Sequence, residues 1–453
     1  MLLSRDKGFY RQVFRLSGWI ALQNAIVCMV GLADNVMIGA YSQDALTGVA
    51  LANQYQFLLQ MLVGGVGGGM AVLTTQYWGE KKLEPIRCVM AIALKLSLAV
   101  GMLFCVVAWF FPANILGLLT GEPVAIAEGV AYMRILCFSF PFFCAGLTLM
   151  NAHRSVESVK VGMVASTAAL VCNVVLNGLL ITGRFGFPEL GARGAAWATL
   201  VARVVEFGVI VVYTYGMDKR LALSWKLFWT PNKAMAKRFR KVAIPVVLSG
   251  GSWGIAMTVQ TGILGRLGAA SIAASSIADA LFQVVSVLAF GMANASAVVI
   301  GKAVGAEEHK RLKEYVNTLQ VLYLAVGIAL GLILFFLKDR ILTMYAITPE
   351  VEALARNFVT VLSMTLVGTT YQCSCLTGIV CGGGNTKFVL YNDLIFMWGL
   401  VLPVSFLAAV VFRWDPVWVF FCLKSDQLAK CAVAVWQVNS YRWVKKVTQE
   451  GAI

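Results

Sequence analysis

The sequence predicts an all-α polytopic membrane protein with twelve transmembrane helices, in two six-helix bundles related by a pseudo-two-fold axis along the membrane normal. Hydrophobic residues make up 59% of the chain and charged residues 13%, whereas soluble domains average about 45–50% and about 25%. Apolar stretches of about 20 residues, enough to cross the hydrocarbon core, recur along the whole chain. The second half also repeats features of the first half in one ungapped register.

The predicted spans follow one another with short connections. They lie at 16–41, 46–77, 88–111, 125–152, 160–183, 192–216, 242–265, 271–301, 314–337, 351–380, 388–412 and 416–441. We therefore expect an N-terminal six-helix bundle at 1–216, a cytoplasmic basic linker at 217–241 and a C-terminal six-helix bundle at 242–453.

Basic residues are distributed unevenly between the predicted loops. The termini and the loops after the even-numbered spans hold most of the 37 Lys and Arg residues; the other loops hold Arg184, Arg193, Arg266, Lys338, Arg340 and Arg413. By the positive-inside rule, both termini lie in the cytoplasm of a multi-pass cell-membrane protein. The net charge of +15 is spread over many short loops, so it does not indicate nucleic-acid binding.

The repeat is clearest between 31–79 and 257–305, where Gly39 aligns with Gly265 and Gly79 with Gly305. Because each repeat has an even number of spans, both repeats begin and end on the same side of the membrane. The symmetry axis therefore runs along the membrane normal. The acid Asp34 is not repeated, because it aligns with Gln260.

Two carboxylates within the spans, Asp34 and Asp279, have no basic residue within a turn on their own helix. A carboxylate in low dielectric is costly unless it is protonated or bound to an ion, so each is a functional-site hypothesis. Asp34, roughly 10 Å below the outer end of its helix, is the main candidate. Asp279 and Gln260 are secondary candidates.

Three polar residues are expected at a similar depth to Asp34. Asn173 and Asn177 lie one turn apart on the fifth span, and Thr199 lies on the sixth. Oxygen ligands around one carboxylate suit either a shared proton or a weakly held Na⁺, and the residues leave both open. We read no catalytic set, cofactor-binding loop or metal-ligand spacing, so we expect neither an enzyme nor a cofactor.

The other charged residues in spans have local explanations. Arg203 and Glu206 are three apart, and Asp426 and Lys430 are four apart, so each pair can neutralise itself on one helix face. Asp393 lies near the cytoplasmic end of its span, where we expect its side chain to reach toward water.

Glycine and histidine also receive structural interpretations. The run GGVGGG at 64–69 is typical of helices that approach closely. His153 and His309 fall in predicted cytoplasmic loops, where we expect solvated side chains.

The sequence resembles the multidrug and toxic compound extrusion (MATE) family over nearly its whole length. The matching pieces are Asp34 in GLADNVMIG, Arg154 to Lys160 after the fourth span, the segment 173–199, GGGNTK at 382–387 and the segment 425–446. The resemblance implies a cation-coupled exporter whose two bundles form a V-shaped cavity. It also implies that Asp34 is the coupling carboxylate, with Asn173, Asn177 and Thr199 as its partners.

The sequence departs from this family at two places. Several relatives have an acid at the position of Asn177, which puts a two-carboxylate relay in doubt. Relatives that bind cations in the C-terminal half have acids where this chain has Trp253 and Thr370. The chain is therefore similar to the branch that works through the N-terminal bundle.

We expect a secondary active multidrug efflux antiporter that exports organic, cationic amphiphilic compounds in exchange for H⁺ or Na⁺ by alternating access. Its expected partners are small-molecule drugs or toxins and the lipid bilayer, without nucleic acid or an obligate protein. The alternative is a lipid-linked oligosaccharide flippase, which needs several cavity cations to hold a pyrophosphate; Arg134, Arg203 and Arg356 are the arginines placed in spans. A receptor or scaffold without flux is a third reading.

Overall fold

The structure is a computed structural model that describes residues 3–183, 186–230, 232–343 and 347–449, so Arg184 lies outside the described residues. All regular structure in these ranges is helical, as predicted. Among the described residues, 11 helical stretches are long and apolar enough to cross a membrane, and each overlaps one of the first eleven predicted spans. The twelfth, 416–441, is divided at Ser425 into α16 (Pro416–Lys424) and α17 (Asp426–Ser440).

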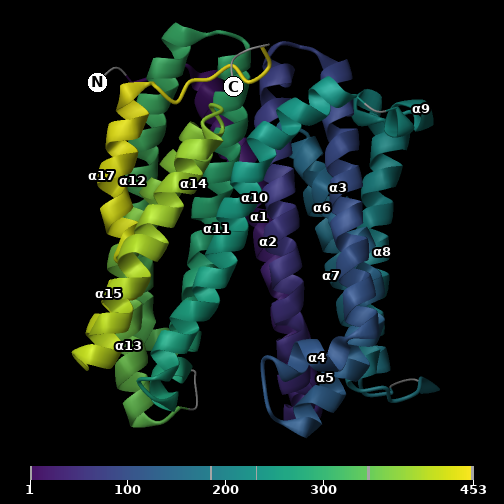
Figure 1. The fold of residues 1–453 in the computed structure, drawn as a ribbon, viewed down its shortest axis with the longest axis vertical. Helices are drawn as coiled ribbons and strands as arrows, with labels where there is room; N and C mark the ends of the chain where they lie inside the picture. The colour runs from purple at the N-terminus through teal and green to yellow at the C-terminus, as the bar shows by residue number, and fades with distance from the viewer. Residues whose placement is uncertain (1–2, 184–185, 231, 344–346, 450–453) are drawn as a thin grey trace. The chain divides into compact units, whose positions relative to one another are not determined.

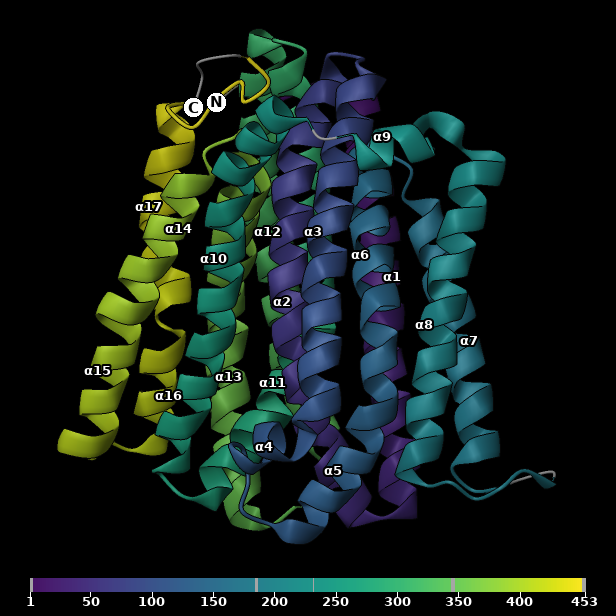
Figure 2. The ribbon, with the colours of Figure 1, turned by 45° about the vertical axis from the view of Figure 1, so that its right-hand side comes forward.

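The described chain forms two compact units, and the helices α1, α2 and α10 contribute to both. The N-terminal unit comprises Leu22–Thr74 and Lys81–Val247. Figures 1 and 2 show its helices, which are the second part of α1 (Lys7–Tyr41), most of α2 (Gln43–Gly79), α3 (Leu83–Phe110), α4 (Pro112–Gly117), α5 (Pro123–Leu136), α6 (Phe140–Ser155), α7 (Lys160–Leu180), α8 (Ala192–Val212), α9 (Trp225–Trp229) and the first part of α10 (Lys233–Gly265).

Glycines let α2 pack directly against the backbone of α10 within this unit. A Cβ atom at Gly65 would lie 2.6 Å from Val247 Cα, and one at Gly69 would lie 2.4 Å from Ala243 Cα. The two glycines are one turn apart, so they form a flat strip on one helix face. The GGVGGG run therefore serves close helix packing, as its composition indicated.

Many large apolar side chains point away from the protein interior. Val36, Phe110 and Val212 are each exposed over about two-thirds of their surface, although they lie in long helices of high hydropathy. Such a surface suits contact with lipid, where exposed apolar side chains cost nothing.

The C-terminal unit comprises Met1–Ala21, Thr75–Glu80 and Leu248–Ile453. Besides the remaining parts of α1, α2 and α10, its helices are α11 (Ala269–Gly305), α12 (His309–Leu342), α13 (Pro349–Cys373), α14 (Thr386–Leu394), α15 (Leu402–Phe406), α16 and α17. Three π-helical segments continue α13, α14 and α15, namely η5 (Ser374–Cys381), η6 (Ile395–Val401) and η7 (Leu407–Val411).

The C-terminal tail, residues 441–449 after α17, is not helical but packs within the C-terminal unit. Trp443 is fully buried, and a Cβ atom at Gly383 would lie 2.1 Å from its ring. Gln76 donates to Lys445 O at 3.0 Å and accepts from Val447 N at 2.9 Å. This tail therefore packs as part of the unit, although no periodic pattern marks it in the sequence.

Candidate functional site

The polar residues predicted around Asp34 come together within the N-terminal unit. Asp34 lies on α1, Asn173 and Asn177 on α7, and Thr199 on α8. Asn173 and Asn177 are fully buried, Thr199 is 6% exposed and Asp34 is 9% exposed. All four side chains are therefore withdrawn from the surface, in helices that the sequence makes apolar.

A close helix contact brings α7 and α8 together at this site. The two helices pack against each other along their length and lie side by side in Figures 1 and 2. A Cβ atom at Gly194 would lie 2.4 Å from Leu180 O, so any larger residue would force the helices apart. The close approach lets the short side chains of Asn173 and Thr199 meet.

A chain of hydrogen bonds runs through the four residues. Asn177 Nδ2 donates to Asp34 Oδ1 at 2.5 Å and to Asn173 Oδ1 at 3.2 Å. Asn173 Nδ2 in turn donates to Thr199 Oγ1 at 3.4 Å. The four side chains thus form one polar cluster in which one change of charge at Asp34 affects every member.

The cluster has room for one more interaction. The Asn177 Oδ1 atom is buried and has no hydrogen-bond partner among the described residues. Amide, hydroxyl and carboxylate oxygens are the ligands that hard cations prefer, and a protonated carboxyl can also donate to such an oxygen. The arrangement can therefore accept either a proton or a small cation at Asp34.

The sequence interpretation missed a tyrosine at this cluster. Tyr132 on α5 is 2% exposed and interacts with Thr199 and, electrostatically, with Asp34. Its hydroxyl is a donor and acceptor that a fully apolar span would lack. A tyrosine within a span is a weak signal, because tyrosines are also common at membrane interfaces.

A small cavity extends the polar region along α8. Its volume is about 10 Å³, close to the room that one water needs. Its polar lining includes Asn173, Thr199, Arg203 and Glu206. Arg203 Nη1 binds Glu206 Oε2 at 2.7 Å, which confirms the predicted local pair.

The secondary candidates lie in the C-terminal unit and are less suited to binding an ion. Gln260 is buried, and its Nε2 atom contacts Met397 Sδ at 3.4 Å. The Asp279 side chain is 49% exposed and binds Lys424 Nζ at 3.2 Å. Asp279 thus has a basic partner. Because this partner lies on α16, the sequence around Asp279 could not indicate it.

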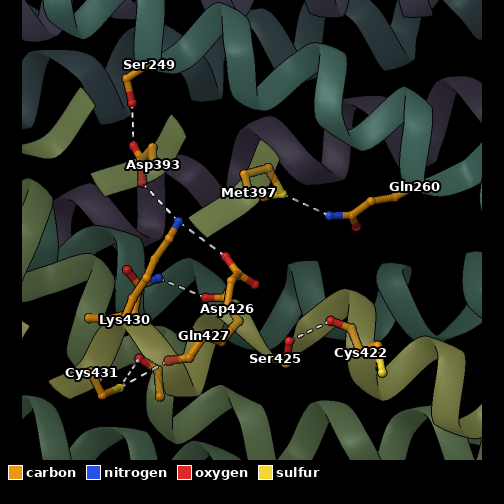
Figure 3. Close-up of polar contacts among 12 residues, drawn as sticks. Ser249, Gln260, Asp393, Met397, Cys422, Ser425, Asp426, Gln427, Lys430 and Cys431 are labelled. Carbon is orange, nitrogen blue, oxygen red and sulfur yellow. Dashed lines mark hydrogen bonds and ion pairs between the residues drawn. The ribbon is translucent and has the colours of Figure 1, made fainter. Parts of the chain in front are cut away.

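A second charged cluster in the C-terminal unit extends one interpretation. Lys430 Nζ lies 3.3 Å from Asp426 Oδ2, as its spacing predicted, but also 3.0 Å from Asp393 Oδ1. Figure 3 shows the ammonium between the two carboxylates, with Ser249 on the far side of Asp393. Asp393 is therefore part-exposed and also held by an ion pair from another helix, a partner that the sequence interpretation did not include.

The histidines differ from each other. His309 is exposed, as expected. His153 is fully buried at the end of α6, and its Nε2 atom lies 2.8 Å from Thr214 Oγ1. The expectation of a solvated side chain at His153 is wrong, because the helix that carries it continues past the predicted end of the span.

Comparisons with known proteins agree with this architecture. The MatE family model matches residues 20–179 and 251–407, more than half of the chain. The probable multidrug resistance protein NorM of Thermotoga maritima is 22% identical over 94% of this chain and 91% of its own length. The multidrug resistance protein PmpM of Pseudomonas aeruginosa is 22% identical over 89% of this chain and 84% of its own length.

The fold also matches a solved structure. A variant of the Vibrio cholerae MATE transporter VcmN superposes with a TM-score of 0.88 at 16% identity, over 98% of this chain and 99% of that one. At this identity the likeness establishes the fold. Taken with the family match, it shows that the chain belongs to the MatE family of multidrug efflux transporters and is not an enzyme.

Proposed function

We propose that this protein exports organic, cationic amphiphilic compounds in exchange for H⁺ or Na⁺, with Asp34 as the coupling carboxylate. The observation that carries the proposal is the cluster around Asp34, in which a buried carboxylate is held by the neutral amide of Asn177. Asn173 and Thr199 continue the cluster. A buried negative charge of this kind favours any ligand that brings a positive charge.

The proposed mechanism is antiport by competition at one charge. A proton or Na⁺ at Asp34 cancels the charge that attracts a cationic compound, so the two are not held well at the same time. Na⁺ would find oxygen ligands in Asp34, Asn173, Asn177 and Thr199, including the unpartnered Asn177 Oδ1. The ion drives export only through its different affinity for the two conformations.

The moving parts in this proposal are the two predicted repeats, 1–216 and 242–453, joined by the basic linker 217–241. Their alternation opens the binding region to one side of the membrane at a time. The distribution of Lys and Arg supports cytoplasmic termini and a cytoplasmic linker in the cell membrane.

The flippase alternative finds little support in the ion pairs. A pyrophosphate site needs arginines that are free to form forked hydrogen bonds. Arg203 already binds Glu206, and Arg356 binds Asp339 and Glu352. Drug efflux is therefore the function that the described contacts favour.

A resistance assay in cells that lack their own efflux pumps tests the role of Asp34. Cells producing the wild-type protein should survive a lipophilic cation such as ethidium at doses that kill cells producing Asp34→Asn, because Asn keeps the shape but loses the charge. Asp44→Asn is the matched control, since Asp44 is an exposed acid of the first turn of α2. Full resistance with Asp34→Asn at equal membrane expression would remove Asp34 from the coupling role.

A further inference from the structure

Counted over its described residues, the charged cluster of Asp393, Asp426 and Lys430 in the C-terminal unit has a net charge of −1. Lys430 supplies one positive charge, whereas Asp393 and Asp426 supply two negative charges. The Lys430 side chain is 5% exposed and the Asp426 side chain 2%. A net negative charge inside helices of a membrane protein costs free energy unless a further cation compensates for it.

The two carboxylates are not equivalent. Asp426 receives hydrogen bonds from Gln427 Nε2 at 3.0 Å on both of its oxygens, in addition to Lys430. Gln427 is itself fixed by Gln372, which donates to Gln427 Oε1 at 2.8 Å. Asp426 is therefore a fully satisfied, buried partner of Lys430.

Asp393, in contrast, faces accessible space. Its side chain is 28% exposed, and besides the ion pair with Lys430 it accepts a hydrogen bond from the Ser249 hydroxyl, at 2.5 Å from Oγ to Asp393 Oδ2. Ser249 lies on α10 and Lys430 on α17, so the carboxylate is reached from two other helices. The surplus negative charge of the cluster is thus presented at Asp393.

The Trp398 indole also lies between α10 and the helix that begins as α14. Trp398, in the π-helical segment η6, donates from Nε1 to Ser252 Oγ at 2.7 Å, and Ser252 is three residues beyond Ser249 on α10. Asp393 and Trp398 are five residues apart, the spacing of a π-helical hydrogen bond. Both side chains therefore contact the same face of α10, and Trp398 is 39% exposed.

We propose that Asp393 and Trp398 form a binding site for an organic monovalent cation in the C-terminal unit. Lys430 is the resident counter-ion of this site. When the cationic group of the ligand reaches Asp393, Lys430 remains paired with Asp426, its partner one turn away on α17. The class of ligand rests on the proposed export function, whereas the site itself rests on the contacts described here.

The charge balance explains why the site selects cations. The cluster goes from a net charge of −1 to zero when one monovalent cation binds, and no proton or electron has to move. A neutral ligand of the same shape leaves the surplus charge in place and gains only apolar contact. The exposed indole face adds a cation–π attraction to the same ligand.

Equilibrium binding of tetraphenylphosphonium to the purified full-length protein tests this site. Asp393→Asn should raise the dissociation constant about tenfold or more, because one charge interaction of about 1.4 kcal/mol corresponds to that factor. Trp398→Leu should raise it about 2- to 30-fold, the range of a cation–π contact. Asp393→Glu keeps the charge and should retain most of the affinity.

The matched control is Asp339→Asn, which neutralises another acid of this unit that is paired at the surface with Arg356. It should leave binding unchanged. Wild-type affinity in both Asp393→Asn and Trp398→Leu, each shown to be folded by its melting temperature, would overturn the proposal. So would the absence of binding to the wild-type protein.

A second variant separates this site from the coupling role of Asp34. Asp34→Asn should bind tetraphenylphosphonium in an Asp393-dependent manner but should not exchange it for an ion. Asp393-dependent binding without ion-driven transport by the wild-type protein would contradict the proposed antiport and leave the site intact. Ion-coupled transport that is unchanged by Asp393→Asn would contradict the proposed site and leave the proposed antiport intact.

Discussion

At Asp34 a carboxylate is kept inside apolar helices by hydrogen bonds from neutral groups. The nearest hydrogen-bond donor is Asn177, and the Arg203 guanidinium interacts with the carboxylate electrostatically. Hydrogen bonds of this kind stabilise the buried carboxylate in the folded protein. Binding of one proton or cation still changes the charge of the whole hydrogen-bonded cluster. That combination is what a coupling site requires.

Removing the amide donor should therefore destabilise the N-terminal unit. Asn177→Ala takes away the hydrogen bond to a buried charged group and should cost about 1.5–3 kcal/mol in the free energy of unfolding. Thermal unfolding of the purified protein measures this cost. Asn114→Ala, at an exposed position of α4, should change the stability little. Equal melting temperatures for the two variants would contradict the assigned role of the Asn177 amide.

An ion pair could be predicted from the sequence when both of its residues lie close together on one helix. The Arg203–Glu206 and Lys430–Asp426 pairs could be predicted, because residues three or four apart share a helix face. The contact between Lys430 and Asp393 could not, since it joins α17 to α14. Hydrophobic periodicity says which face of a helix is buried but not which helix covers it.

Among the helices, length and hydropathy predicted nearly all of the described spans, because a segment crossing lipid must satisfy its own backbone hydrogen bonds. The break at Ser425 between α16 and α17 and the π-helical segments were not predicted. These features depend on packing against neighbouring helices, which the periodicity of one helix does not show.

The Asp34 cluster depends on the close packing of the two helices α7 and α8. Gly194→Val would place side-chain atoms against Leu180 O, and such overpacking should cost about 1–3 kcal/mol. The displaced helices should also separate Asn173 from Thr199, so ethidium resistance should fall together with the melting temperature. Gly208→Ala on the same helix adds a Cβ atom with no neighbour within 4 Å and should be tolerated. Normal resistance with Gly194→Val would show that the close approach is dispensable.

The C-terminal tail should contribute strongly to the stability of its unit. Trp443→Ala removes a fully buried indole that packs on Gly383 and donates to Val438 O at 2.9 Å, and it should cost about 3–5 kcal/mol. Chemical or thermal unfolding of the purified protein measures the loss. Trp436→Ala on α17, where the indole is 59% exposed, is the control. A similar small effect of both substitutions would mean that the tail is not anchored by Trp443.

In the molecule as a whole, the two halves differ at the position of Asp34. Two repeats share a register, but only the first has an acid at the aligned position, where the second has Gln260. Ion coupling is accordingly proposed for the N-terminal unit, and cation binding at Asp393 for the C-terminal unit. The sequence indicated the first assignment through its unpaired acid, whereas the second required contacts between α10, α14 and α17.

The most direct test of coupling is ethidium transport into or out of sealed proteoliposomes, driven in turn by an imposed proton gradient and an imposed Na⁺ gradient. The wild-type protein should exchange ethidium under at least one gradient, which identifies the coupling ion, and Asp34→Asn should fail under both. Asp34→Asn transporting at the wild-type rate, or no transport by the wild-type protein under either gradient, would contradict the assignment of Asp34 as the coupling carboxylate.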